Sequence, residues 1–251
     1  MSLPTLYGFL LVLARVSGVI VFVPLPGMTS TPEVAKIVLA LALTFALIEV
    51  WPTPNANEIS FGSLAGSVAA EFSFGLMVGV AVSFLFEGMQ LAAQMIGLQA
   101  GYSYASTIDP STQADSGILQ ILTQLAAGFV FFALGLDRQV IRVLAYSLEK
   151  VPAGSYFSRA SVTSTIVQLG SAVFLTGLRL AMPVVSLLLL IDISFAIFAK
   201  VHTQLQLLSL SFAAKMLAGL ALLATGLTVF PLVAQKAASH TFETLFRLLS
   251  R

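Results

Sequence analysis

Residues 93–117 form a polar segment inside an otherwise strongly apolar chain, and this contrast limits what the chain can fold into. Hydrophobic residues make up 58% of the sequence, yet this segment is rich in small and polar side chains and contains no Lys or Arg. Hydrocarbon offers such side chains no hydrogen-bonding partner. We therefore expect the segment to face protein or water as a buried re-entrant loop, with breaks at Gly97, Gly101 and Asp109-Pro110.

The rest of the composition is typical of a polytopic membrane protein. The chain has 251 residues, of which 9% are charged, and a mean hydropathy of +0.98. At roughly 20 residues per span, about six apolar helices fit and little remains for a soluble domain. The apolar stretches run over residues 3–23, 34–51, 64–86, 118–136, 162–198 and 207–230. The fifth is too long for one span, and we expect it to divide near Met182-Pro183, because proline lacks a backbone donor and clashes with the preceding turn.

Several charged residues lie in the middle of apolar helices rather than at their ends. These residues are Arg15, Glu71, Arg179, Asp192 and Lys215. A charge at the bilayer centre costs about 2.5–3.5 kcal/mol, so we expect neighbouring groups to shield them. One interpretation is structural ion pairs, such as Arg15 with Glu71 or Arg179 with Asp192. The alternative is that the charges line an aqueous lumen, and the sequence does not decide which pairs form.

Small residues recur at helical spacing between residues 62 and 83. They lie on two faces, with Gly62, Gly66 and Ala70 on one and Gly75, Gly79 and Ser83 on the other. Such faces let helices approach closely. We interpret both as packing surfaces within a helical bundle.

Features of soluble enzymes and of nucleic-acid-binding proteins are missing from the sequence. The chain has no Cys, which excludes disulfides and thiol chemistry, and a formal net charge of +1, which argues against nucleic acid as a partner. His202 and His240 are far apart and lack a carboxylate cluster with metal-ligand spacing. No phosphate-binding or dinucleotide-binding Gly loop is present. We expect no enzymatic activity, no metal and no cofactor. We also expect no cleaved signal peptide, because no basic residue precedes the first apolar run and Arg15 interrupts it.

The order of residues 96–110, IGLQAGYSYASTIDP, resembles the most recognisable stretch of the FliR family, subunits of the flagellar type III protein-export gate. The resemblance covers essentially the whole chain. It includes Arg15 in the first apolar span, the break at residues 24–27, the Pro-led helix from Thr31, and the turn at residues 152–154. One departure is visible, because many relatives carry Gly-His where this chain has Leu136-Asp137. A role tied to that histidine is therefore not carried over to this chain.

The resemblance implies an all-α fold of membrane-associated helical hairpins. Residues 1–182 would form a FliP-like portion that includes the polar loop, and residues 183–251 a FliQ-like hairpin. The subunit would close a helical FliP/FliQ assembly in the bacterial inner membrane, within the flagellar basal body. FlhB-like and FlhA-like export proteins, unfolded protein substrates and membrane lipid are the further expected partners.

The resemblance also assigns a role to the polar loop, because the corresponding loop in this family is a plug across the secretion channel. The expected pore and plug residues are Gly97, Gln99, Gly101, Tyr102, Tyr104, Ser106, Ile108, Asp109, Pro110, Gly117 and Ile118. The two isoleucines and two tyrosines would provide apolar closure, and Gly101 and Gly117 would be hinges. The residues alone are equally compatible with a re-entrant loop of purely structural use.

The last segment, residues 233–251, is amphipathic. Phe242, Leu245, Phe246 and Leu249 share one face, while the charged residues Lys236, Glu243, Arg247 and Arg251 lie elsewhere. This pattern predicts either anchoring at the lipid headgroups or, with the resemblance, a contact with an FlhB-like protein at the cytoplasmic entrance.

Two other functions remain open from the sequence. The first is the homologous subunit of a virulence injectisome. The second belongs to a different class, a secondary transporter with a midplane substrate site, which would also explain intramembrane charges and broken helices. The lack of visible paired repeats argues against the transporter.

Overall fold

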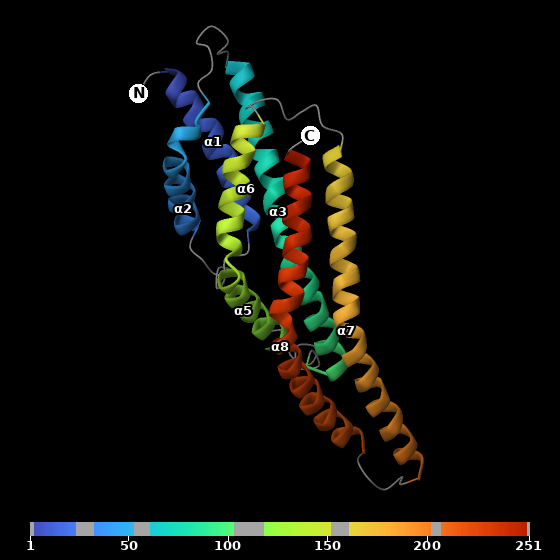
Figure 1. Ribbon diagram of the computed structural model, residues 1–251. Coiled ribbons are helices and arrows are strands. Elements are labelled where there is room, and N and C mark those ends of the chain that lie inside the picture. Colours follow the sequence, from blue (N-terminus) through green and yellow to red (C-terminus); the bar gives the residue numbers. More distant parts are fainter. Residues whose placement is uncertain are drawn as a thin grey trace. The chain divides into compact units, whose positions relative to one another are not determined.

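The computed structural model describes residues 3–23, 33–52, 61–102, 118–151, 161–201 and 207–249. Regular structure within these ranges is helical, which confirms the predicted all-α class. The elements in chain order are α1 (Leu3–Phe22), α2 (Glu33–Ala46), the 3-10 helix η2 (Ile48–Val50), α3 (Phe61–Ala100), α5 (Ile118–Ala133), α6 (Leu136–Lys150), α7 (Ser161–Val201) and α8 (Leu207–Leu249) (Figure 1).

The described helices include four that are long and apolar enough to cross a membrane. These candidate spans are Pro4–Phe22, Leu64–Ala100, Val167–Val201 and Leu210–Arg247. The pair α5 and α6, bent where Leu134-Gly135 separates them, adds a fifth if it is one broken span, and is otherwise a re-entrant element. The stretch 34–51 differs from the prediction, since it forms the 14-residue α2 followed by η2. Fourteen residues of helix measure about 21 Å, less than the hydrocarbon thickness of about 30 Å.

Helix α7 is continuous over 41 residues and passes through Pro183, so the predicted division at Met182-Pro183 is wrong. Helix α8 likewise continues through Pro231. Both prolines are exposed, so each ring lies on the outside of its helix. Each proline removes one backbone hydrogen bond, whereas an open break in an apolar environment would leave several backbone groups unpaired.

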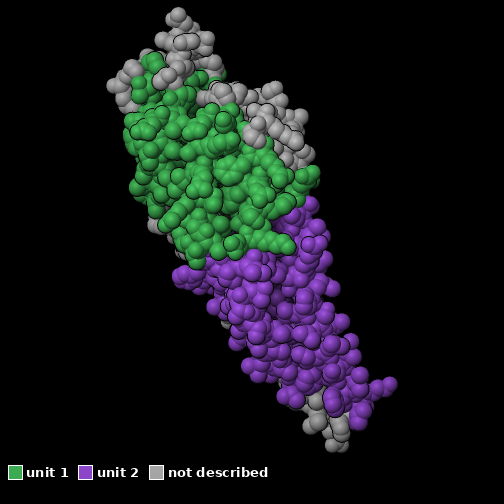
Figure 2. All heavy atoms as spheres, in the orientation of Figure 1, with its two compact units in different colours: residues 1–85, 131–170, 235–251 green, residues 86–130, 171–234 purple. Residues whose placement is uncertain are grey.

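The chain forms two compact units, coloured separately in Figure 2. Unit 1 comprises residues 1–85, 131–170 and 235–251, and unit 2 comprises residues 86–130 and 171–234. Each unit is therefore assembled from segments that are far apart in the sequence. Helices α3, α7 and α8 each contribute residues to both units.

In unit 1, α1 and α3 pack closely because glycines lie at their contact. A Cβ atom on Gly75 would overlap the backbone carbonyl of Arg15, and one on Gly79 would lie 2.6 Å from the carbonyl oxygen of Val19. This confirms one of the two predicted small-residue faces. The other predicted face packs only at Ala70, which is 0% exposed, whereas a Cβ atom on Gly62 or Gly66 would meet nothing within 4 Å.

The amphipathic end of α8 also packs inside unit 1. Phe242, Leu245 and Leu249 are buried, and the Phe246 ring lies edge-on to the ring of Tyr146 in α6, with centroids 5.5 Å apart. The predicted anchoring of this apolar face at the lipid headgroups is therefore wrong, because burial against the chain's own helices removes the face from lipid. The alternative, that the segment contacts an FlhB-like protein, stays a prediction.

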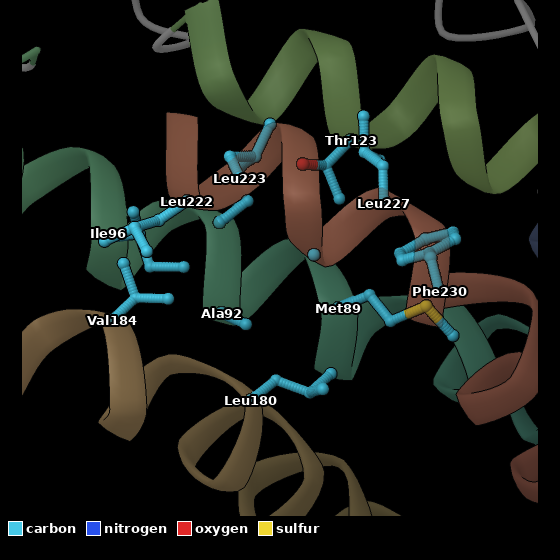
Figure 3. Close-up of a pocket in the computed structure, with 12 residues that line it drawn as sticks. Met89, Ala92, Ile96, Thr123, Leu180, Val184, Leu222, Leu223, Leu227 and Phe230 are labelled. Carbon is cyan, nitrogen blue, oxygen red and sulfur yellow. The ribbon is translucent and has the colours of Figure 1, made fainter. Parts of the chain in front are cut away.

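In unit 2, α3, α7 and α8 share an apolar core. It contains Ala92, Ile96 and Ala100 of α3, Ala181 and Leu188 of α7, and Leu223 of α8. The small side chains bring the helices together, and the larger ones fill the space between them. A cavity of about 90 Å³ remains, lined by apolar side chains and by Thr123 of α5 (Figure 3).

Candidate functional site

The polar segment begins as helix and not as loop. Residues 93–100 form the last two turns of α3, which corrects the predicted start of the re-entrant loop at Ala93. Gly97 is buried within this helix and does not break it. The neighbouring residues Ala93, Met95 and Leu98 favour helix, and their propensities outweigh the cost of one interior glycine.

Gly101 ends α3. Its φ is +89°, in the left-handed region that glycine adopts without a Cβ penalty. Its N–H donates to the carbonyl of Leu98 at 3.2 Å, and the N–H of Tyr102 donates to the carbonyl of Gly97 at 3.0 Å. These two hydrogen bonds form a Schellman cap that satisfies carbonyls at the helix end.

The capped end of α3 is held against α8. The hydroxyl of Tyr102 donates a 2.7 Å hydrogen bond to the backbone carbonyl of Met216. A Cβ on Gly101 would lie 3.2 Å from the ring of Phe212, and one on Gly219 would lie 2.9 Å from the Cβ of Ala100. Larger residues at these glycines would push the two helices apart. The close contact between α3 and α8 therefore fixes the position at which the polar segment begins.

Six of the predicted plug residues lie outside the described residues: Tyr104, Ser106, Ile108, Asp109, Pro110 and Gly117. Ile118 is the first residue of α5, and its side chain also lies outside the described part. Of the predicted pore and plug residues, the structure brings together Gly97, Gln99, Gly101 and Tyr102.

Next to this helix end, Asp192 of α7 joins three helices. Its carboxylate accepts a hydrogen bond from the Gln99 side-chain amide of α3 at 3.1 Å and pairs with Lys215 Nζ of α8 at 2.8 Å. The Lys215 ammonium also lies 5.2 Å from the centroid of the Phe212 ring. The side chain of Lys215 is only 12% exposed and that of Asp192 is 35% exposed, so this polar cluster is partly shielded from solvent.

The predicted pair of Arg179 with Asp192 is wrong. Both residues lie on the continuous helix α7, and thirteen residues of helix separate them by about 20 Å. Arg179 is exposed, which also contradicts its prediction as a buried charge, and it has no ion-pair partner within the described ranges.

The predicted pair of Arg15 with Glu71 is confirmed. Arg15 is fully buried in unit 1, and its Nε donates to Glu71 Oε2 at 2.5 Å. Its two other nitrogens donate to Ser147 Oγ at 3.1 Å and to the carbonyl of Val151 at 3.3 Å. The guanidinium also lies 4.6 Å from the centroid of the Phe74 ring. One side chain thus joins α1 to α3 and to the end of α6.

Sequence reasoning missed the third partner of this network. Ser147 lies on the buried face of α6 with Val140, Val143 and Leu144. A hydroxyl at helical spacing among apolar residues was the available signal, because a buried hydroxyl requires a hydrogen-bonding partner.

Sequence reasoning also missed Glu87. This residue lies within the candidate span Leu64–Ala100, yet its side chain is exposed. Neither a salt bridge nor a hydrogen bond to it is found in the part of the chain that the structure describes. Within the same part of the chain, no three His, Cys, Asp or Glu side chains gather as metal ligands.

The chain is similar to known proteins over nearly its whole length. The family model described as "Bacterial export proteins, family 1" matches residues 6–241. The flagellar biosynthetic protein FliR of Escherichia coli strain K12 is 27% identical over 238 residues, which cover 95% of this chain and 89% of that protein. FliR of Bacillus subtilis strain 168 is 25% identical over 246 residues, covering 97% and 95%. FliR of Caulobacter vibrioides is 26% identical over 238 residues, covering 90% and 91%. The chain therefore belongs to the FliR family of bacterial export proteins.

Proposed function

We propose that this chain is a non-enzymatic core subunit of the flagellar type III protein-export gate in the bacterial inner membrane. The observation that carries the proposal is the family match over residues 6–241, together with near-full-length similarity to flagellar proteins. The three relatives above carry flagellar names, which favours the flagellar system over a virulence injectisome.

The lengths of the apolar helices support a role within an assembly. The candidate spans of α7 and α8 contain 35 and 38 residues, so each measures more than 50 Å. Hydrocarbon about 30 Å thick covers little more than half of such a helix, even with moderate tilt. The remaining apolar surface requires cover from protein.

Burial within the chain does not supply this cover. Only 11% of the most apolar window of α7 and of α8 is buried inside the chain, against 50% for α1 and 56% for α3. Large apolar side chains such as Phe174, Leu190 and Leu217 are more than half exposed. Helices of FliP-like and FliQ-like subunits are the partners that the family implies for these faces. FlhB-like and FlhA-like proteins would join the assembled gate.

We also carry over the family's division of the chain. Residues 1–182 correspond to a FliP-like portion and residues 183–251 to a FliQ-like hairpin. The division concerns sequence ancestry and is separate from the two compact units, each of which combines segments from distant parts of the chain.

The polar segment that follows Gly101 is proposed to be the plug of the closed gate. The support from the described residues is its fixed starting point, because the Schellman cap and the hydrogen bond from Tyr102 hold the end of α3 against α8. A plug requires one rigid end so that closure is reproducible. Unfolded flagellar proteins would be the substrates that pass when the plug is displaced.

Co-expression with FliP-like and FliQ-like subunits tests the proposed function. We expect the three proteins to co-purify as one complex and the chain to melt at a higher temperature in the complex than alone. An isolated chain that is monodisperse and equally stable would contradict the proposal. Solute transport by the isolated chain in liposomes would instead support the transporter alternative.

Deletion of residues 111–115 tests the plug separately. The shortened loop should leave assembly intact and make the closed complex leaky to small ions, measured as membrane conductance. A deletion variant that assembles and conducts no more than the wild type would show that the loop has only a structural use.

A further inference from the structure

A polar stripe runs along the exposed side of α3 in unit 2. Glu87, Gln90 and Gln94 are spaced by three and four residues, so they lie on one face of the helix. Glu87 and Gln94 are exposed and Gln90 is half-buried. None of the three side chains has a hydrogen bond or ion pair within the described parts of the chain.

This stripe points away from the core of unit 2. The adjacent Gly88 faces α7, where an added Cβ would lie 3.0 Å from the carbonyl oxygen of Val173. Phe86 and Met89, on either side of Glu87 and Gly88 in the sequence, are buried at 2% exposure. Leu91, four residues after Glu87 and so on the same side of α3, packs against α7, since a Cβ on Gly177 would lie 2.8 Å from its Cδ2. Beside this contact, Glu87, Gln90 and Gln94 have no polar partner among the described residues.

Among the described residues Glu87 has no charged partner, and the same is true of Arg179 of α7, whereas two other pairs of charges neutralise each other. Arg15 pairs with Glu71 in unit 1, and Asp192 pairs with Lys215 in unit 2. Glu87 lies within the candidate span Leu64–Ala100. A charge exposed to hydrocarbon is strongly unfavourable, so this face of α3 meets either protein or water.

The surroundings of the stripe favour protein. Leu98, eleven residues after Glu87 and therefore on the same face, is 60% exposed. The polar patch thus covers about two helical turns and then gives way to exposed apolar surface. A limited polar patch beside apolar surface matches helix–helix contacts in membranes, where side-chain hydrogen bonds join otherwise apolar helices.

We propose that this stripe of α3 is the docking site for a membrane helix of another subunit that carries a Lys or Arg opposite Glu87. The cation would neutralise the carboxylate, and the Gln90 and Gln94 amides would hydrogen-bond to polar side chains of the same helix. The inference rests on the proposed function, because it requires a hetero-oligomeric assembly.

The first test compares two neutralised carboxylates. Glu87→Gln keeps the shape of the side chain and removes its charge, and Glu243→Gln makes the same change at an exposed position of α8 in unit 1. Truncating one member of a buried intersubunit charge pair weakens binding strongly. We expect at least a tenfold loss of purified complex for Glu87→Gln and no loss for Glu243→Gln. Equal melting temperatures of the isolated variants would exclude misfolding as the cause.

The second test uses the absence of cysteine from the chain, which makes single-cysteine reporters unambiguous. Gln94→Cys and Leu98→Cys report on the stripe, and Ser239→Cys is an exposed control. We expect a water-soluble maleimide to label all three in the isolated chain and only Ser239→Cys in the complex. Labelling of both stripe positions in the complex, with normal assembly of Glu87→Gln, would mean that the face borders water, and the proposal would be wrong.

The two tests separate this proposal from the proposed function. If the wild-type chain does not co-purify with the partner subunits, the proposed function is wrong and the docking proposal is lost with it. If the wild type assembles and Glu87→Gln assembles equally well, only the docking proposal is wrong. A Glu87→Lys variant whose assembly is restored by an acidic substitution in a partner helix would identify the opposing cation.

Discussion

Breaking the buried Arg15–Glu71 pair should destabilise unit 1 more than removing both charges. Arg15→Met leaves the 1%-exposed Glu71 carboxylate without its guanidinium and leaves the Val151 carbonyl without its 3.3 Å donor. Glu71→Leu leaves the buried guanidinium without its counter-charge. Each single replacement should cost about 3–5 kcal/mol of unfolding free energy. The double variant removes both charges, keeps similar volume, and should cost less than either single variant.

The assay is reversible unfolding of the purified chain in mixed detergent micelles, followed by helical circular dichroism. Arg15→Met combined with Glu243→Leu is the matched control, because Glu243 is exposed and pairs only with Arg247 one turn away among the described ion pairs. That control should be additive to within about 0.5 kcal/mol. If the Arg15→Met/Glu71→Leu variant is also additive, the two buried charges do not stabilise each other and the reasoning fails.

Three further predictions concern packing and the polar cluster of unit 2. Gly75→Ala should cost about 1–3 kcal/mol because its Cβ overlaps a backbone carbonyl of α1, whereas Gly66→Ala, which meets nothing within 4 Å, should stabilise α3 by about 0.5–1 kcal/mol. Thermal melting of the isolated chain checks both. Leu245→Ala, at a 1%-exposed position, should cost about 2–5 kcal/mol, and Leu217→Ala, at a 70%-exposed position, less than about 0.5 kcal/mol in the same assay. Asp192→Asn should cost about 1–3 kcal/mol, because it leaves the 12%-exposed Lys215 ammonium without its counter-charge, while the site is 35% exposed and the amide oxygen still accepts from Gln99; a loss below about 0.5 kcal/mol would contradict this.

The all-helical membrane architecture and the family could be predicted from the sequence. Hydropathy is a sum over neighbouring residues, so long apolar runs predict spans without knowledge of the fold. Gly75 and Gly79 could be assigned to a packing face because helical spacing is also local. The family rested on residues 96–110 and on scattered motifs, whose order survives in the chain whatever its conformation.

Helix ends were less predictable, since they depend on what surrounds them. Residues 93–100 read as polar loop, but they form helix because Ala100 packs against Gly219 and the Gln99 amide finds Asp192. Pro183 read as a break, but the exposed position of its ring let α7 continue. For residues 93–100 these tertiary contacts add to the helix propensity of Ala93, Met95 and Leu98, and for Pro183 the exposed ring leaves the helix intact.

The choice of partners was decided only by the tertiary structure. The sequence shows five charged residues within apolar helices, but it does not determine which of them pair, because an ion pair depends on distance in space. One continuous α7 holds Arg179 about 20 Å from Asp192, while α8 brings Lys215 within 2.8 Å of the same carboxylate. The amphipathic end of α8 shows the same limit, since its pattern predicts one apolar face, and only the packing of Phe246 on Tyr146 shows that the chain itself covers it. Local chemistry determines which surfaces must be buried, and long-range geometry determines what buries them.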